Sequence, residues 1–386
     1  MAATPVATER PGTPEEAADL LRDLAADGRA VRVRGGGTKA SWAAGGEPVA
    51  VELSTGGLDR ILEHNEGDFT AILQAGLPFA EAAAAFAQNG QMLALDPPLG
   101  AGDAATLGGI VASADSGPLR HRYGGVRDLI VGITVALSDG SLASAGGKVI
   151  KNVAGYDLGK LFAGSFGTLG LVVSMAVRLH PRPEETATAS GSSEDIAALA
   201  GAAGALGRLP LEADCLDIAW RDGAGRLLVR FGGAAAERQA DAVADRLRAA
   251  GLVDVDAGAD DDALWAAQRD GQRCAGGAVL KVSGLPAELH RVLAAARDAD
   301  ATVVGRAALG LSWVALQGDD LPARVTAVRT ALAPRACTLL DAPDALRAEC
   351  PPWPDPHPGA LAVMHRVKER FDPARIFAPG SFVGGI

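Results

Sequence analysis

The chain has 386 residues, 48% of them hydrophobic, so it is long enough to form two or three domains with well-buried cores. Its formal charge of −11 gives no electrostatic support for binding a phosphate backbone, and we exclude nucleic acid as a partner. The N-terminus lacks the charged start and apolar core of a signal peptide, and no apolar run is long enough to span a bilayer. We therefore expect a cytoplasmic protein.

The cysteines give no indication of a metal site. Zinc and iron–sulfur sites usually bind through cysteine pairs that are only a few residues apart. The four cysteines of this chain lie far from one another, at Cys215, Cys274, Cys337 and Cys350. The sequence therefore predicts free thiols and no bound metal.

The first elements carry the signals of a helix, a strand and a glycine-rich loop. Thr13 precedes Pro14, with a glutamate three residues after the threonine, and this capping pattern predicts a helix that ends near Gly28. A strand at 30–34 then runs into the loop at 35–39, which has neither the G-x-G-x-x-G nor the Walker spacing. Successive N–H groups in such a loop can bind an anion, and an ordinary tight turn is the alternative.

Two further glycine-rich segments follow in the first half of the chain. The loop at 95–109 is rich in proline and glycine, and its Thr106 can cap a short helix that extends to residue 113. A hairpin over 130–145 leads into the segment 146–172. Glycine clusters of this kind indicate positive φ angles or a ligand that lies against bare backbone. Between these elements we expect strands at 49–53, 58–64, 70–75 and 170–180 and a helix at 78–89.

The composition changes after residue 183. Residues 184–212 are alanine-rich and predict a loosely helical passage, after which strands and helices alternate up to residue 341. This alternation predicts an α+β domain built on an antiparallel sheet with helices on one side. We therefore predict domains at 1–183 and 184–350, followed by a linker and tail at 351–386 that pack back on the first domain.

Three separated glycine loops on a strand-rich scaffold suit a ligand that has two phosphates and two flat ring systems. Backbone N–H groups would bind the pyrophosphate, and the absence of side chains would let the rings approach closely. FAD fits this description.

Four motifs carry a resemblance to a known family. They are RGGGTK at 34–39, ATLGGIVAS at 105–113, SGPLRHRYGGVRDLIVG at 116–132 and KNVAGYDLGKLFAGSFGTLGLV at 151–172. The first 180 residues resemble the FAD-binding domain of the vanillyl-alcohol oxidase (PCMH) type, and the chain is most similar to the FAD-binding subunits of glycolate oxidases. The tail FDPARIFAPG at 371–380 shares the resemblance. The likeness implies a two-part FAD-binding domain followed by an α+β cap domain.

The resemblance implies particular contacts with FAD, which we expect to be bound non-covalently. Residues expected around the pyrophosphate are Arg34, Gly35, Gly36, Gly37, Thr38 and Lys39. A second contact comes from Thr106, Gly108 and Gly109, with Ala112 and Gly117 nearby. The flavin and ribityl side is expected to meet Gly164, Ser165, Gly167, Thr168 and Gly170, and Val172 offers backbone to the adenine half. The expected cations near the flavin are Lys148 and Lys151, with Asn152 and Tyr156 as neighbours.

Oxidation of a 2-hydroxy acid needs a base near the hydroxyl group and a cation for the carboxylate. Beyond residue 181 the chain has only the scattered His290, His357 and His365, so we identify no catalytic residue. The resemblance implies a glycolate oxidase complex with two partners, a homologous flavoprotein subunit and an iron–sulfur subunit. A small 2-hydroxy acid would be oxidised at the level of the complex, and any membrane association would come through the partners.

Two other interpretations stay open. The chain could be a stand-alone FAD-dependent 2-hydroxy-acid dehydrogenase in which the arginines at 120–127 bind the substrate carboxylate as a bidentate clamp. It could also be a scaffold subunit that kept the fold and lost the flavin.

Overall fold

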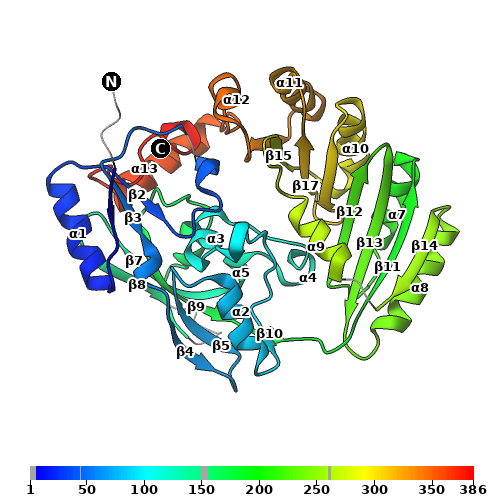
Figure 1. The fold of residues 1–386 in the computed structure, drawn as a ribbon, viewed down its shortest axis with the longest axis horizontal. Coiled ribbons are helices and arrows are strands. Elements are labelled where there is room, and N and C mark those ends of the chain that lie inside the picture. The colour runs from blue at the N-terminus through cyan, green and yellow to red at the C-terminus, as the bar shows by residue number, and fades with distance from the viewer. Residues whose placement is uncertain (1–5, 44, 149–154, 260–261) are drawn as a thin grey trace.

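The structure is a computed structural model that describes residues 6–43, 45–148, 155–259 and 262–386. Two halves lie side by side, each built on β-sheet with helices packed against it (Figure 1). The later half, coloured green to orange, follows the earlier half along the chain. The red helix α13 near the C-terminus lies back against the earlier half.

Residues 7–54 form a small parallel sheet in the order β1-β3-β2. The Thr13 hydroxyl accepts a hydrogen bond of 3.1 Å from the backbone N–H of Glu16, which is the predicted capping contact. The helix that it starts packs the buried Leu21 and Leu24 against this sheet. The bounds are β1 (Ala7–Glu9), α1 (Pro14–Ala26), β2 (Val31–Arg34) and β3 (Val51–Ser54).

An antiparallel sheet in the order β4-β5-β9-β7-β8 follows. Its central strand β9 is apolar and buried along most of its length, as expected for a strand covered on both faces. The strands are β4 (Ile61–Asn65), β5 (Thr70–Gln74), β7 (Ile130–Ala136), β8 (Leu142–Gly146) and β9 (Leu171–Arg178). A second, two-stranded ladder joins β6 (Gln91–Met92) and β10 (His180–Pro181). The helices are α2 (Phe79–Ala87), α3 (Leu107–Ser113), α4 (Arg120–Tyr123), α5 (Val126–Leu129) and α6 (Gly159–Phe162).

The later half is an eight-stranded antiparallel sheet in the order β14-β11-β13-β12-β16-β17-β15-β18. Its strands are β11 (Thr186–Ser193), β12 (Cys215–Arg221), β13 (Ala224–Gly232), β14 (Val253–Gly258), β15 (Ala278–Ser283), β16 (Thr302–Arg306), β17 (Leu311–Leu316) and β18 (Ala336–Leu339). The main core lies between this sheet and α7 (Ile196–Leu206), α8 (Ala236–Ala249), α10 (Leu289–Asp298) and α11 (Leu321–Leu332). The predicted fold class, α+β with an antiparallel sheet in the later half, is confirmed.

The opposite face of the eight-stranded sheet is turned towards the earlier half. Trp313 and Val279 on this face share a buried cluster with Trp42, which comes from the short helical turn after the first glycine loop. On the same side, Trp265 of α9 (Asp262–Asp270) packs with Leu119 of the earlier half. The two halves therefore meet through buried aromatic side chains.

One expected element is wrong in detail. The passage at 184–212 was expected to be loosely helical, but its first part is the strand β11, and only Ile196–Leu206 is helical. The sequence of β11, TATASGSS, contains two threonines, which favour strands. Strand β11 is paired on both sides, with β13 and β14, so tertiary pairing decides its conformation.

The tail after α12 (Asp344–Glu349) returns to the small parallel sheet through α13 (Pro358–Phe371). The N–H of Val31 donates to the carbonyl oxygen of Ile376 at 2.8 Å, and the N–H of Ala378 donates to that of Val31 at 2.9 Å. Phe377 thus lies beside Val31 in a parallel bridge, directly before the first glycine loop.

Candidate cofactor site

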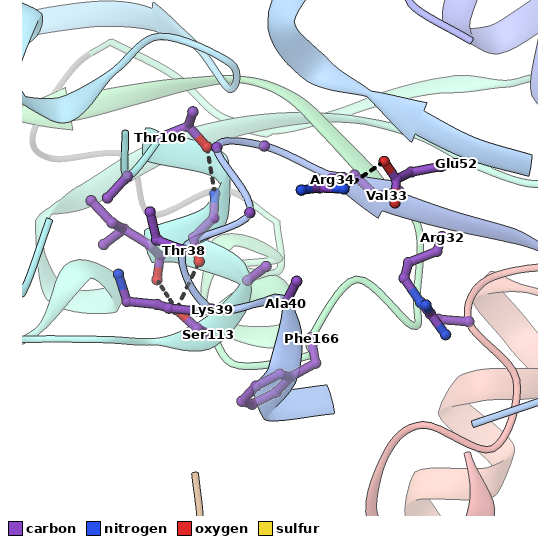
Figure 2. Close-up of a pocket in the computed structure, with 18 of the residues that line it drawn as sticks. Arg32, Val33, Arg34, Thr38, Lys39, Ala40, Glu52, Thr106, Ser113 and Phe166 are labelled. Atoms are coloured by element: carbon purple, nitrogen blue, oxygen red, sulfur yellow. Dashed lines mark hydrogen bonds and ion pairs between the residues drawn. The ribbon is translucent and has the colours of Figure 1, made fainter. Parts of the chain in front are cut away.

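A pocket of about 320 Å³ lies where the glycine loop after β2 meets helix α3 (Figure 2). Five stretches of chain contribute to it: the end of β2 with the loop itself, Glu52 of β3, α3 with the residues before it, the turn at 166 and the C-terminal tail. The lining residues are Arg32, Val33, Arg34, Gly35, Gly36, Gly37, Thr38, Lys39, Ala40, Glu52, Ala105, Thr106, Gly109, Ile110, Ala112, Ser113, Phe166, Ala378 and Ser381.

The first two predicted glycine loops come together at this pocket, and the contact requires glycine. A Cβ atom at Gly35 would lie 2.1 Å from the Thr106 hydroxyl oxygen, and one at Gly36 would lie 1.6 Å from the carbonyl oxygen of Ala104. Gly37 has a φ of +72°, which side chains rarely adopt. The loop is therefore closed down onto residues 104–106, and larger residues would push the two apart.

The backbone of the loop has hydrogen-bond donors to offer. Within the described part of the chain, none of the N–H groups of residues 35–39 donates a hydrogen bond to another protein group. Five successive unused donors along the wall of a pocket suit an anion with several oxygens, such as a pyrophosphate. The glycine cradle and these donors fit the phosphates of FAD.

The two arginines at the pocket differ in whether their side chains are already paired. Arg34 is paired with Glu52 at 3.0 Å, as the dashed line in Figure 2 shows. The guanidinium group of Arg32 forms no hydrogen bond or ion pair with any residue that the structure describes, although its backbone pairs with Glu52 in the β2–β3 ladder. Arg32 is therefore the arginine that is available to an anionic ligand, although the sequence motif points to Arg34.

The side chain of Lys39 is buried and bonded to other protein groups. Its ammonium group lies 3.2 Å from Asp115 and donates to the carbonyl oxygen of Pro98 at 2.9 Å. Burial lowers the pKa of Lys39, and the Asp115 carboxylate opposes that shift. This lysine thus ties the glycine loop to Pro98 and Asp115.

The third glycine segment docks on the end of α3. The N–H of Gly164 donates to the carbonyl oxygen of Val111 at 2.9 Å, and the N–H of Phe166 donates to that of Ala112 at 2.8 Å. The hydroxyl groups of Ser165 and Thr168 donate to backbone carbonyls within the turn. These polar groups are already bonded, and Phe166 is the residue of the segment that lines the pocket.

Several predicted contacts lie outside this pocket. Gly108 packs on Ala75 and Gly117 on Asp96, since a Cβ atom would meet them at 2.8 Å and 1.9 Å. Gly164, Ser165, Gly167, Thr168, Gly170 and Val172 do not line it either. Tyr156 is 91% exposed, and Lys148 is paired with Glu63 at 2.8 Å on the surface. Lys151 and Asn152 lie outside the described residues.

Sequence reasoning missed part of the lining. Arg32 and Glu52 lie on neighbouring strands whose alternation could have placed them on one face. Ala378 and Ser381 lie more than 330 residues from the loop, and nothing local indicates that they line its pocket. They reach it because the tail pairs with Val31.

A second hollow, of about 650 Å³, lies on another side of the same loop. Gly36, Gly37 and Thr38 line both hollows, and the second is completed by residues 273–277 and 341–343 of the later half. Thr38 is held there because its carbonyl oxygen accepts a hydrogen bond of 3.0 Å from Arg273. The later half therefore supports the glycine loop directly.

The arginines at 120–127 do not line the pocket. Arg122 donates to the carbonyl oxygen of Glu212 at 2.6 Å and lies 3.5 Å from Asp214, both in the later half. Arg120 donates to the Ser116 hydroxyl at 3.2 Å. The bonds of Arg122 are therefore used to hold the two halves together.

The described residues contain neither a metal-binding cluster nor a membrane-spanning helix. No group of three or more histidine, cysteine, aspartate or glutamate residues among them could hold a metal ion. None of their helices combines the length and the apolar character that a membrane span requires.

Comparisons with known proteins agree with the geometry. Residues 5–146 match the model of the FAD binding domain, and residues 356–382 match that of the FAD linked oxidases, C-terminal domain. Glycolate oxidase subunit GlcE of Escherichia coli is 38% identical over 123 residues, which are 32% of this chain and 35% of the relative. Glycolate oxidase subunit GlcD of Bacillus subtilis is 39% identical over 144 residues, 37% of this chain and 30% of the relative.

A mitochondrial D-lactate dehydrogenase [cytochrome] 1 of Saccharomyces cerevisiae is 32% identical over 151 residues, 39% of this chain and 25% of the relative. The matched segments thus cover about a third or less of these relatives. A solved structure of alkyldihydroxyacetonephosphate synthase superposes with a TM-score of 0.70 at 15% identity, covering 96% of this chain and 76% of that one. That likeness shows a shared fold. The two matches therefore indicate FAD as the cofactor and relate residues 5–146 to FAD binding domains and residues 356–382 to the C-terminal domain of FAD linked oxidases.

Proposed function

We propose that this chain is the FAD-binding subunit of a glycolate oxidase type of complex, a 2-hydroxy-acid dehydrogenase. In this proposal it binds FAD non-covalently and takes part in electron transfer from glycolate oxidation. The single observation that carries it is the pocket at residues 35–39, whose five N–H groups are unused and whose glycines lie against residues 104–106. Similarity to the GlcE and GlcD subunits supports the choice of complex.

The residues of the pocket have separate tasks in this proposal. The N–H groups of residues 35–39 bind the pyrophosphate, and Arg32 adds a positive charge beside it. Thr106 stabilises the start of α3, where its hydroxyl accepts a hydrogen bond of 3.3 Å from Gly109. Bound FAD supplies the redox chemistry, since its ring system accepts and releases electrons. The attachment is non-covalent because the lining residues include neither histidine nor cysteine.

We assign the oxidation of the 2-hydroxy acid to a partner flavoprotein. Abstracting a proton from the substrate requires a positioned base. The one carboxylate that lines the pocket, Glu52, is paired with Arg34, and the lysine is paired with Asp115. An iron–sulfur partner would then receive the electrons in the assembled complex.

The first test is flavin binding by the purified full chain. After incubation with FAD and gel filtration, we expect a flavin absorbance spectrum with about one FAD per chain, and acid treatment should release all of the flavin. A chain that stays colourless would instead support the flavin-free scaffold.

The second test is co-purification from cells that express the chain together with the products of neighbouring genes. We expect a flavoprotein and an iron–sulfur protein to be retained, with glycolate-dependent reduction of an artificial acceptor only in the complex. Turnover of glycolate or D-lactate by the isolated chain would contradict the assignment to a partner.

That outcome would favour a stand-alone 2-hydroxy-acid dehydrogenase. This alternative is supported by similarity to relatives whose names are those of dehydrogenases and not of subunits. They include the yeast D-lactate dehydrogenase and a rat D-2-hydroxyglutarate dehydrogenase that is 32% identical over 177 residues.

A further inference from the structure

Three aromatic rings from distant parts of the chain meet at the edge of the cofactor pocket. The ring of Phe166 lies 5.0 Å from that of Trp353 in an edge contact and 5.5 Å from that of Phe382 in a stacked one. Trp353 and Phe382 contact each other edge to face at 4.9 Å. Phe166 alone of the three lines the pocket, and it is labelled in Figure 2 with the other lining residues. The two tail rings therefore support Phe166 from outside the pocket.

The backbone at Phe166 is in an unfavourable conformation. Its φ of 53° lies in the left-handed region, which a residue with a side chain rarely adopts. Ala378, which also lines the pocket, has a φ of 39°. Such residues persist where surrounding contacts hold them, and they are concentrated at ligand sites. At Phe166 the contacts include the hydrogen bond to Ala112, the two tail rings and packing against the buried cluster of Trp42.

A buried lysine joins the turn of Phe166 to the tail. Lys368 of α13 is 4% exposed, and its ammonium group donates to the carbonyl oxygens of Thr168 at 2.7 Å and Phe377 at 2.9 Å. It is also paired with Asp372 at 2.6 Å. These bonds tie the turn that carries Phe166 to the tail that carries Phe382.

We propose that Phe166, supported by Trp353 and Phe382, is a stacking surface for a planar ring of the bound dinucleotide. This inference rests on the proposed FAD binding and names the side chains that recognise its ring. The chemistry is that of a flat, polarisable heteroaromatic ring, which prefers offset or edge contacts with aromatic side chains. The isoalloxazine and the adenine of FAD both satisfy it, and the experiment distinguishes them.

The test uses the full chain and measures the dissociation constant of FAD by flavin fluorescence. We expect Phe166→Ala to raise this constant about tenfold to a hundredfold, the range that loss of one ring–aromatic stacking contact produces. Trp353→Leu should raise it less, because it removes support and not the contacting ring. Phe166→Leu retains an apolar side chain of similar size, so it should fold even if Phe166→Ala does not. We expect its dissociation constant for FAD to lie between those of the wild type and Phe166→Ala.

Phe69 is a matched control. It has a φ of 51°, is half-buried, and lies in the turn between β4 and β5 outside the lining of the pocket. Phe69→Ala should lower thermal stability as Phe166→Ala does, yet leave the FAD constant unchanged. Equal dissociation constants of FAD for the two alanine variants would contradict the proposal that a ring stacks on Phe166, but they would not contradict the proposal that the chain binds FAD. If the wild type binds no FAD, the proposed function fails as well.

The same variants with FMN and with ADP identify the ring. A selective loss of FMN binding in Phe166→Ala assigns the contact to the isoalloxazine, and a selective loss of ADP binding assigns it to the adenine. If both constants equal those of the wild type, no ring stacks on Phe166 and the proposal is wrong.

Discussion

The indole N–H of Trp42 donates a hydrogen bond of 2.8 Å to the carboxylate of Asp341 in the later half of the chain. The same carboxylate is paired with Arg273 at 2.7 Å, and Arg273 donates to the carbonyl oxygen of Thr38. The glycine loop is thus held between its own half of the chain and the later half.

Replacing Asp341 should weaken both the fold and the cofactor site. Asp341→Ala leaves the buried indole N–H and Arg273 without their partner, so we expect the free energy of unfolding to fall by about 2–4 kcal/mol. The FAD constant should rise because Thr38 loses its support. Urea denaturation with and without FAD measures both. As a control, Asp245→Ala removes an exposed pair with Arg248 and should change stability by less than about 1 kcal/mol. Equal losses in the two variants would contradict the role of Asp341.

A single methyl group at Gly36 should abolish FAD binding. The Cβ atom of Gly36→Ala would lie 1.6 Å from the carbonyl oxygen of Ala104, so the loop must move away from α3. Gly201→Ala adds the same group in α7, where nothing lies within 4 Å, and should be neutral or stabilise by about 0.5–1 kcal/mol. Flavin absorbance after gel filtration reports binding, and thermal melting reports folding. Retained flavin in Gly36→Ala would show that the loop does not hold the phosphates.

The contribution of Asp96 to stability should fall as the pH rises from about 4 to about 7. Burial raises the pKa of this carboxyl group from its ordinary value of 3.8 to about 7. Between these two pH values the folded chain therefore binds more protons at Asp96 than the unfolded chain does. The stability that Asp96 contributes thus declines from about pH 4 to about pH 7. Asp96→Asn should flatten that decline, and urea midpoints at several pH values measure it. An unchanged profile in Asp96→Asn would place the titrating group elsewhere.

Arg306 and Asp217 form a fully buried ion pair at 2.7 Å. We expect Arg306→Met to cost about 3–5 kcal/mol, because it leaves the Asp217 carboxylate buried and uncompensated. Arg306→Met combined with Asp217→Leu should regain most of that loss, since both charges are then gone. Denaturation of the two single variants and the double variant gives the coupling energy. Additive losses would mean that the two side chains do not depend on each other.

Much of the earlier half could be predicted because its signals are local. A few adjacent residues are enough to predict the cap at Thr13, the β7–β8 hairpin and the glycine loop at 35–37. The strand β11 was not predicted because its partners β13 and β14 lie more than 30 residues away. Propensity along the chain does not report such pairing.

The same limit applies to the site. The sequence motif identifies the loop but not which side chains remain available, since the pairing of Lys39 with Asp115 depends on the folded chain. Phe166 has no periodic signal, and its place at the pocket depends on the turn docking on α3. The tail residues Ala378 and Ser381 reach the pocket only through pairing with Val31.

The parallel bridge between Val31 and Phe377 has a consequence for how the protein matures. Ribosomes synthesise the eight-stranded sheet before they reach the residues that flank Phe377. During translation the pocket at the glycine loop therefore lacks the wall that Ala378 and Ser381 form until the whole later half has been made. Cofactor loading should then be a late event in biogenesis, and partly synthesised chains should emerge without flavin.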